Sequence, residues 1–199
     1  YKCDISRSEE VKSLISFTES LYQKVNIIFN NASIIMNTDK GLLEVEDYTF
    51  DRTYEVNVKG TFYLSKYGIF ALRRANGGVI INTSSFVSML GSAVSQISYT
   101  ASQGAILSMT KELAVVHAKE NIRIIPFCPG HYKTSKMMNM TALASDKQKR
   151  LIHHPMGRFG KSYELANSLL FLASDEASYF TGTPFIVDGG LTSSYITPE

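Results

Sequence analysis

The sequence has 199 residues, of which 44% are hydrophobic and 19% charged, and its formal net charge is +2 at neutral pH. These values are typical of a globular chain with a sizeable core, and we expect one domain over residues 1–199. The small charge and the lack of a basic cluster argue against nucleic-acid binding, and no apolar run is long enough to span a membrane. Cys3 and Cys128 lack metal or disulfide spacing, which favours a reducing intracellular compartment such as the cytoplasm.

In chain order, helical periodicities over about residues 8–24, 46–74, 99–120 and 162–172 alternate with short apolar runs. The runs near residues 25–29, 78–83, 122–127 and 184–187 are predicted to be strands. Such alternation predicts an α/β fold, a parallel sheet with helices on both faces. Pro126 lacks a backbone N–H, so we expect irregular pairing in the third of these strands.

Hydroxyl side chains gather where the second predicted strand ends, at Thr83, Ser84 and Ser85, and Tyr99 opens the next helix. A serine at the carboxyl end of a strand can hold a substrate oxygen while a facing tyrosine exchanges a proton with it. The residue four positions after Tyr99 shares its helical face, and a lysine there would favour the phenolate. This chain has Gln103 instead.

Further motifs accompany this pair in a fixed order: Asn30-Asn31-Ala32-Ser33, Asn57 in Val-Asn-Val-Lys-Gly, Asn82-Thr-Ser-Ser85, Tyr99-Thr-Ala-Ser-Gln103, Pro129-Gly130 and Asp188-Gly189-Gly190. Together they resemble the short-chain dehydrogenase/reductase family, NAD(P)-dependent oxidoreductases with a Rossmann-like, doubly wound parallel sheet. In the family's Tyr-x-x-x-Lys motif, Gln103 takes the place of the lysine. The resemblance covers nearly the whole chain.

The resemblance implies catalytic roles for Ser85, Tyr99, Asn57 and Gln103. It also implies contacts with NAD or NADP, made by Asp4, Asn30, Ala32, Tyr99, Gln103, Pro129, Gly130, Tyr132 and Thr134. The expected substrate is a small carbonyl compound or alcohol, and the expected assembly is a homodimer or homotetramer. Asp4 is equally consistent with a turn or capping residue.

None of the 199 residues forms a glycine-rich strand–turn–helix, the element that cradles a dinucleotide pyrophosphate. We therefore expect an N-terminally truncated fold without its first strand–helix–strand unit, and doubtful cofactor binding by this chain alone. Two functions stay open: an NAD(P)-dependent oxidoreductase with impaired activity, and a catalytically inactive relative with an interaction role.

Residues 131–154 correspond to the family's substrate-binding lid and contain Met137, Met138 and Met140. The adjacent His153 and His154 raise the possibility of a metal site. Neighbouring residues point in different directions on a helix or strand, and no third ligand has suitable spacing. No metal is expected.

Overall fold

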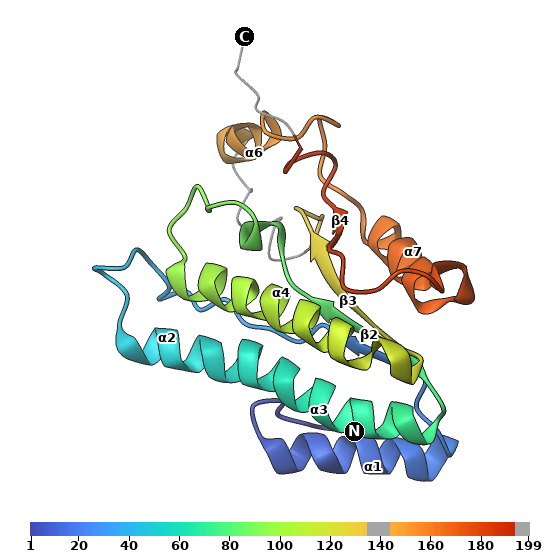
Figure 1. The fold of residues 1–199 in the computed structure, drawn as a ribbon. Coiled ribbons are helices and arrows are strands. Elements are labelled where there is room, and N and C mark those ends of the chain that lie inside the picture. The colour runs from blue at the N-terminus through green and yellow to red at the C-terminus, as the bar shows by residue number, and fades with distance from the viewer. Residues whose placement is uncertain (135–143, 194–199) are drawn as a thin grey trace.

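The computed structural model describes residues 1–134 and 144–193 (Figure 1), so the methionines of the expected lid lie outside the described residues. The strands are β1 (Ile27–Asn30), β2 (Gly78–Thr83), β3 (Ile122–Pro129) and β4 (Phe185–Val187). The α-helices are α1 (Ser8–Tyr22), α2 (Asp47–Tyr54), α3 (Gly60–Arg74), α4 (Ile97–His117), α6 (Ala144–Leu151) and α7 (Ser162–Ala173). Shorter helical segments are η1 (Glu55–Lys59), η2 (Phe86–Ser88), η3 (Ala118–Glu120) and η4 (Asp175–Ala177).

The strands form one sheet in the order β1-β2-β3-β4, and every neighbouring pair is parallel. This confirms the predicted parallel α/β fold. The register places Ile28 opposite Ile80 and Ile80 opposite Ile124, so matching side chains point to the same face of the sheet. All carboxyl ends therefore meet at one edge, where open α/β sheets bind their ligands.

Helices cover both faces of the sheet (Figure 1). On one face, Ile28, Ile80 and Ile124 pack in a core with residues of α1, α3 and α4. On the other face, Val79 and Ile125 pack with α7. Side chains of β2 and β3 point alternately to the two faces of the sheet, and apolar side chains lie on both faces. This is expected for strands that are buried between two layers of helices.

β3 pairs regularly through Pro126, which lies opposite Asn82, so the expected irregular pairing of this strand is wrong. The backbone N–H and C=O of Ile124, two residues earlier, face Thr181 and Gly182 on the β4 side. Backbone direction alternates along a strand, so the N–H that Pro126 lacks would also face the β4 side. β4 begins only at Phe185, opposite Phe127, and no ladder bond is lost.

The residues of α2, η1 and α3 follow one another as a continuous helical run from Asp47 to Arg74, which confirms the long helix predicted there. Its centre is the π-helix η1, which contains the fully buried Asn57. Such π segments recur at functional sites because one extra residue per turn redirects side chains.

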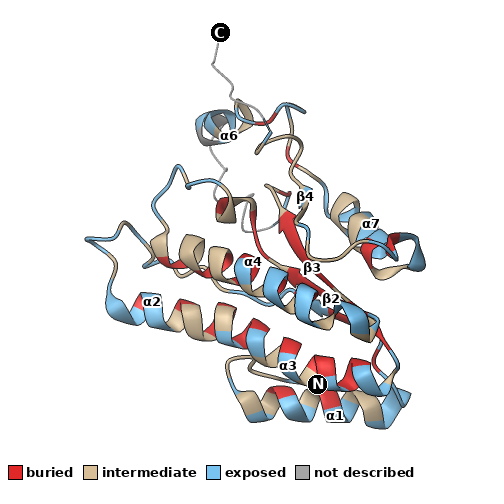
Figure 2. Ribbon diagram, viewed as in Figure 1, coloured by how far each residue is buried: buried red, intermediate tan, exposed pale blue. Residues whose placement is uncertain are grey.

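β1 carries apolar surface that α7 does not cover. Ile27 and Phe29 point to the α7 face of the sheet and are 53% and 41% exposed. The central strands β2 and β3, in contrast, are mostly buried (Figure 2). Among the described residues, none pairs with the outer edge of β1. None of the helices in the described ranges is both long and apolar enough to cross a bilayer.

Candidate active site

Ser85 and Tyr99 meet at the carboxyl edge of the sheet. Ser85 lies two residues beyond the end of β2, and Tyr99 is in the first turn of α4. The Ser85 hydroxyl lies close enough to the Tyr99 phenol to act on its pKa. Burial raises the pKa of the Tyr99 phenol above its usual value of about 10, and the Ser85 hydroxyl lowers it by less. The phenol therefore keeps its proton at neutral pH.

A carboxylate from a distant loop fixes the start of α4. The N-cap residue Gln96 makes no side-chain capping bond. Instead, the backbone N–H groups of Ser98 and Tyr99 donate to the two carboxylate oxygens of Asp39, over 3.1 and 2.9 Å. An acidic group at a helix N-terminus is favourable because it satisfies free N–H groups and the helix dipole. Asp39 thus positions the tyrosine, and our sequence reasoning missed it.

Asn57 connects η1 to this helix. Its amide oxygen accepts from the Ile34 backbone N–H over 2.8 Å, and its amide nitrogen donates to the Ile34 carbonyl over 3.0 Å. The same nitrogen donates to the Ser102 hydroxyl over 3.1 Å, which donates to the Tyr99 carbonyl over 2.7 Å. Asn57 thereby joins the chain after β1 to the turn that carries the tyrosine.

We expect Asn57→Ala to lower the free energy of unfolding by about 2–4 kcal/mol, because it leaves a backbone N–H and a carbonyl of Ile34 without partners. Urea denaturation followed by circular dichroism measures this loss. Exposed Asn37 provides the control, Asn37→Ala, for which we expect a change below about 0.5 kcal/mol. Equal stabilities of the two variants would contradict the linking role of Asn57.

Gln103 is 1% exposed, and neither its amide oxygen nor its amide nitrogen has a partner among the described residues. Its backbone carbonyl, in contrast, accepts from the Ser84 hydroxyl over 3.0 Å and so holds the end of β2 against α4. A buried amide without hydrogen bonds costs about 1–3 kcal/mol. A group that both donates and accepts, as a ribose hydroxyl does, would satisfy it.

The other residues expected to contact a cofactor differ in placement. Ala32 is exposed after β1, whereas the buried Asn30 amide donates to the Asn82 side chain over 2.6 Å, inside the sheet. Gly130 lies so close to Asp188 that a Cβ added to Gly130 would be 2.7 Å from the Cα of Asp188. The Tyr132 hydroxyl donates to the Val187 carbonyl over 2.7 Å, so this side chain braces β4.

Thr134 and Pro129 lie at the same edge of the sheet. Pro129 is the last residue of β3, and Thr134 is exposed five residues later. Both remain candidates for contact with a ligand that lies across the strand ends.

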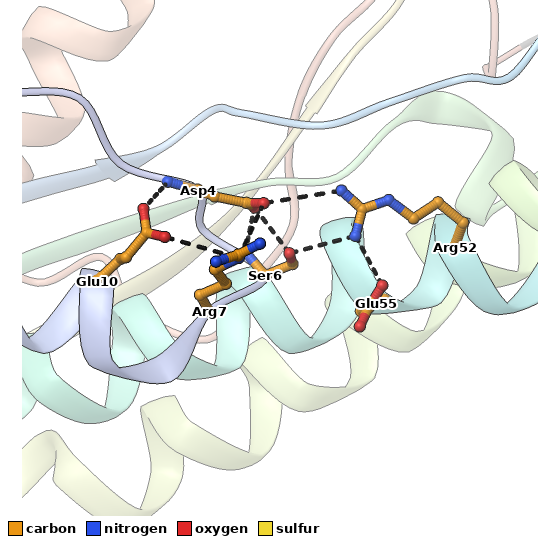
Figure 3. Close-up of polar contacts among 6 residues, drawn as sticks. All are labelled: Asp4, Ser6, Arg7, Glu10, Arg52 and Glu55. Atoms are coloured by element: carbon orange, nitrogen blue, oxygen red, sulfur yellow. Dashed lines mark hydrogen bonds and ion pairs between the residues drawn. The ribbon is translucent and has the colours of Figure 1, made fainter.

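Asp4 is part of a surface network with the first turn of α1 and with α2 (Figure 3). Its carboxylate accepts from the Ser6 backbone and hydroxyl over 3.0 and 2.7 Å, and it forms a 3.8 Å ion pair with Arg52. The Ser6 hydrogen bonds hold the pKa of Asp4 below its usual value. These contacts give Asp4 the turn role left open by its sequence, and none of them joins it to Ser85 or Tyr99.

The histidine pair His153-His154 does not act as a unit. His154 is buried and contacts His131, with 3.2 Å between His131 Nδ1 and His154 Nε2. In residues 1–134 and 144–193 there is no group of three or more metal-binding side chains.

Comparison with known proteins agrees with the parallel α/β fold. The family model described as enoyl-(acyl carrier protein) reductase matches residues 1–192. A 3-oxoacyl-(acyl-carrier-protein) reductase of Thermotoga maritima is 32% identical over 96% of this chain and 76% of that protein. A cyclohexanol dehydrogenase of an Acinetobacter species is 33% identical, with coverage of 96% and 74%.

A solved short-chain type dehydrogenase/reductase of Mycobacterium marinum superposes with a TM-score of 0.89 at 28% identity, over 97% of this chain and 75% of that one. The fold and the relatives define the class as a nicotinamide-dependent oxidoreductase. The chain belongs to the short-chain dehydrogenase/reductase family. It spans about three quarters of the length of these relatives.

Proposed function

We propose that this protein reduces a small carbonyl compound to an alcohol, with Tyr99 as proton donor and Ser85 as the group that holds the substrate oxygen. The observation that carries the proposal is the proximity of the two hydroxyl groups at the edge where parallel strands end, together with the raised pKa of the phenol. A protonated phenol is the form that carbonyl reduction requires, because the new alkoxide must receive a proton.

The two side chains have separate tasks. The Ser85 hydroxyl accepts from the Val87 N–H, 3.4 Å away, so its own proton can turn from the Tyr99 oxygen to donate to a carbonyl oxygen. The Tyr99 phenol transfers its proton to that oxygen as negative charge develops there, and the resulting phenolate recovers a proton from solvent. NADH or NADPH, when bound, supplies the hydride that reaches the carbonyl carbon. Asn57 and Asp39 hold the phenol in place.

The residues around Tyr99 fit a nicotinamide cofactor in part. The unpartnered Gln103 amide is placed one turn after Tyr99, and it supplies a donor and an acceptor for ribose hydroxyls. Gln103 brings no positive charge, so it does not lower the pKa of the phenol as a lysine would. Ala32, Pro129, Gly130 and Thr134 would line the remainder of the site with backbone and small groups, and Asp4 and Tyr132 would support it from outside.

We expect the 199-residue chain alone to bind NADH and NADPH with dissociation constants well above the low-micromolar range. The reason is that it contains no glycine-rich turn whose N–H groups could surround the pyrophosphate. Titration calorimetry with each nucleotide measures the constants, and the same chain preceded by a glycine-rich strand–turn–helix from a relative serves as reference. A low-micromolar constant for the chain alone would contradict this expectation.

Ketone reduction tests the proposed function. The protein assayed is the 199-residue chain preceded by the glycine-rich strand–turn–helix from a relative. With cyclohexanone and saturating NADPH or NADH, we expect turnover that Ser85→Ala lowers by roughly 10- to 100-fold, as loss of one oxyanion-type donor does. Ser20→Ala, on the exposed side of α1, is the control and should not change turnover. Absence of turnover with bound nucleotide, across a panel of ketones and aldehydes, would favour the inactive, interacting relative instead.

We also propose assembly into a homodimer or homotetramer. Helices α2, α3 and α4 expose large apolar side chains, and Tyr48, Phe62 and Val115 are 68%, 45% and 78% exposed. Such surface is normally covered by a partner, and two-fold association is the commonest solution.

The free state of Cys3 and Cys128 supports the proposed reducing compartment.

Light scattering at micromolar concentrations tests this assembly, and we expect a mass at least twice that of the 22.1 kDa chain. Phe62→Glu should shift the mass towards the monomer, because it buries a charge in the contact. The control Leu21→Glu, at an exposed position of α1, should leave the mass unchanged. A monomer at every concentration tested would exclude the proposal.

A further inference from the structure

His131 lies at the carboxyl edge of the sheet, the edge that also carries Ser85, and it has no part in the chemistry proposed for Ser85 and Tyr99. It follows Pro129, the last residue of β3, and β3 is the neighbour of the strand that leads to Ser85. Its ring packs edge-on against Phe86, the residue after Ser85, with 4.8 Å between ring centroids. His131 therefore contacts the sequence neighbour of the serine that is proposed to hold the carbonyl oxygen.

Hydrogen bonds of His154 determine which nitrogen of His131 carries a proton. His154 Nδ1 lies 2.8 Å from the Arg150 carbonyl oxygen. A carbonyl only accepts, so His154 Nδ1 carries the proton, and Nε2 of a neutral His154 is an acceptor. His131 Nδ1, 3.2 Å from that Nε2, must then be the donor. The Nε2 atom of a neutral His131 is left with a free lone pair.

The surroundings keep His131 neutral. Burial, with smaller contributions from the nearby His154 and Arg150, lowers the pKa of His131 to about 4. Phe159 also packs against both imidazole rings, with centroid distances of 5.8 and 5.3 Å. A positive charge on His131 would be poorly solvated among these rings. The hydrogen bonds and ion pairs described for His131 and His154 include no carboxylate that could compensate it. The pair therefore has one direction of hydrogen bonding, from His131 to His154 to Arg150.

We infer that His131 Nε2 accepts a hydrogen bond from a second polar group of the substrate, and that the preferred substrates are hydroxy ketones rather than plain ketones. This inference rests on the proposed reduction at Ser85 and Tyr99 and adds the substrate class. An acceptor near the reacting carbon selects ligands that carry a hydroxyl or N–H donor a few atoms from the carbonyl. A site built to bond such a donor discriminates against the analogue that lacks it, because its own polar group is then left unpaired.

The kinetic test compares cyclohexanone with 2-, 3- and 4-hydroxycyclohexanone in the chain with the preceding glycine-rich segment. We expect at least one hydroxylated ketone to have a kcat/KM about 10-fold above that of cyclohexanone, the effect of one hydrogen bond of ordinary strength. His131→Phe keeps an aromatic ring beside Phe86 but has no acceptor. It should bring the ratio of kcat/KM for the hydroxylated ketone to kcat/KM for cyclohexanone close to one.

Two further variants separate recognition from packing. His154 is a positioning residue, because it acts through His131. His154→Gln can still accept from His131 Nδ1 and should retain the preference, whereas His154→Leu cannot and should lose it. His117→Gln changes a histidine that pairs with Glu120 at the far end of α4, and it should leave the ratio at the wild-type value. An unchanged ratio in His131→Phe, or no preference for any hydroxylated ketone, would overturn the inference.

A measurement without turnover tests the protonation of His131 separately. Nitrogen-15 NMR of the imidazole rings distinguishes protonated from lone-pair nitrogens, and the signals are assigned with the His131→Phe and His154→Leu variants. In the chain without cofactor at neutral pH, we expect a lone-pair signal for His131 Nε2 and a protonated signal for Nδ1. The reverse pattern would overturn the assignment of His131 as an acceptor. Failure to reduce any ketone, with the expected NMR pattern intact, would instead contradict the proposed function.

Discussion

Tyr99→Phe should lower kcat/KM for ketone reduction by about 100- to 10,000-fold, the contribution typical of a positioned general acid. The substitution removes one oxygen atom and leaves an aromatic ring of nearly the same volume in the first turn of α4. The remaining hydrogen bonds that fix this turn use the backbone of Tyr99 and the side chains of Asp39 and Ser102, so they survive the change. The loss of rate should thus occur without a comparable loss of stability.

A second tyrosine supplies a matched control. The Tyr67 hydroxyl forms a 2.7 Å hydrogen bond with Ser8, between α3 and α1, and it takes no part in the candidate site. Tyr67→Phe should keep the wild-type kcat/KM, although it loses a bond between two elements. Steady-state assays with both variants and thermal unfolding of each measure the two effects. If Tyr99→Phe retained more than about a tenth of the activity, the role of Tyr99 as proton donor would be wrong.

Gln103→Lys should accelerate alcohol oxidation far more than ketone reduction. A lysine ammonium one helical turn from the phenol lowers its pKa by about 1–3 units, which raises the phenolate fraction at pH 7 by about 10- to 1,000-fold. Oxidation needs the phenolate as base and should increase by a similar factor. Reduction needs the phenol, which stays mostly protonated because burial starts from a pKa above the usual value.

Single-turnover rates in both directions, measured in the chain with the preceding glycine-rich segment, test this difference. Gln103→Met is the control, because it keeps the length of the side chain without an amide or a charge. It should weaken cofactor binding through the lost ribose contact but leave the ratio of the two rates unchanged. Equal rates for the wild-type chain and Gln103→Lys in both directions would show that position 103 does not tune Tyr99.

The sheet was predictable because its signals are local. The apolar runs of all four strands are short and lie between helical periodicities, and each strand was placed within two residues of its observed start and end. The pairing of Pro126 was not predictable, because it depends on where β4 begins, more than fifty residues later along the chain. Helix α4 also begins two residues before Tyr99, since its start is fixed from outside by Asp39.

The parts of the site that escaped prediction are contacts between distant residues. Asp39 lies sixty residues from Tyr99, and His131 lies 23 residues from His154. A buried chain of side chains from Asn30 through Asn82 to Thr110 crosses from β1 to α4 in the same way. Asp39, Thr110 and His131 have no distinctive local pattern, whereas Ser85, Asn57 and Tyr99 stood in recognisable motifs.

The protonation state of Tyr99 in the free protein tests the central claim most directly, because it requires neither cofactor nor substrate. Carbon-13 labelling of the phenol carbons of the eleven tyrosines, with Tyr99 assigned by its absence from Tyr99→Phe, allows NMR titration with pH. We expect Tyr99 to stay protonated through the ordinary tyrosine pKa of about 10. A Tyr99 phenol that loses its proton below the ordinary tyrosine pKa of about 10 would contradict the account of Tyr99 as an acid that is protonated at neutral pH.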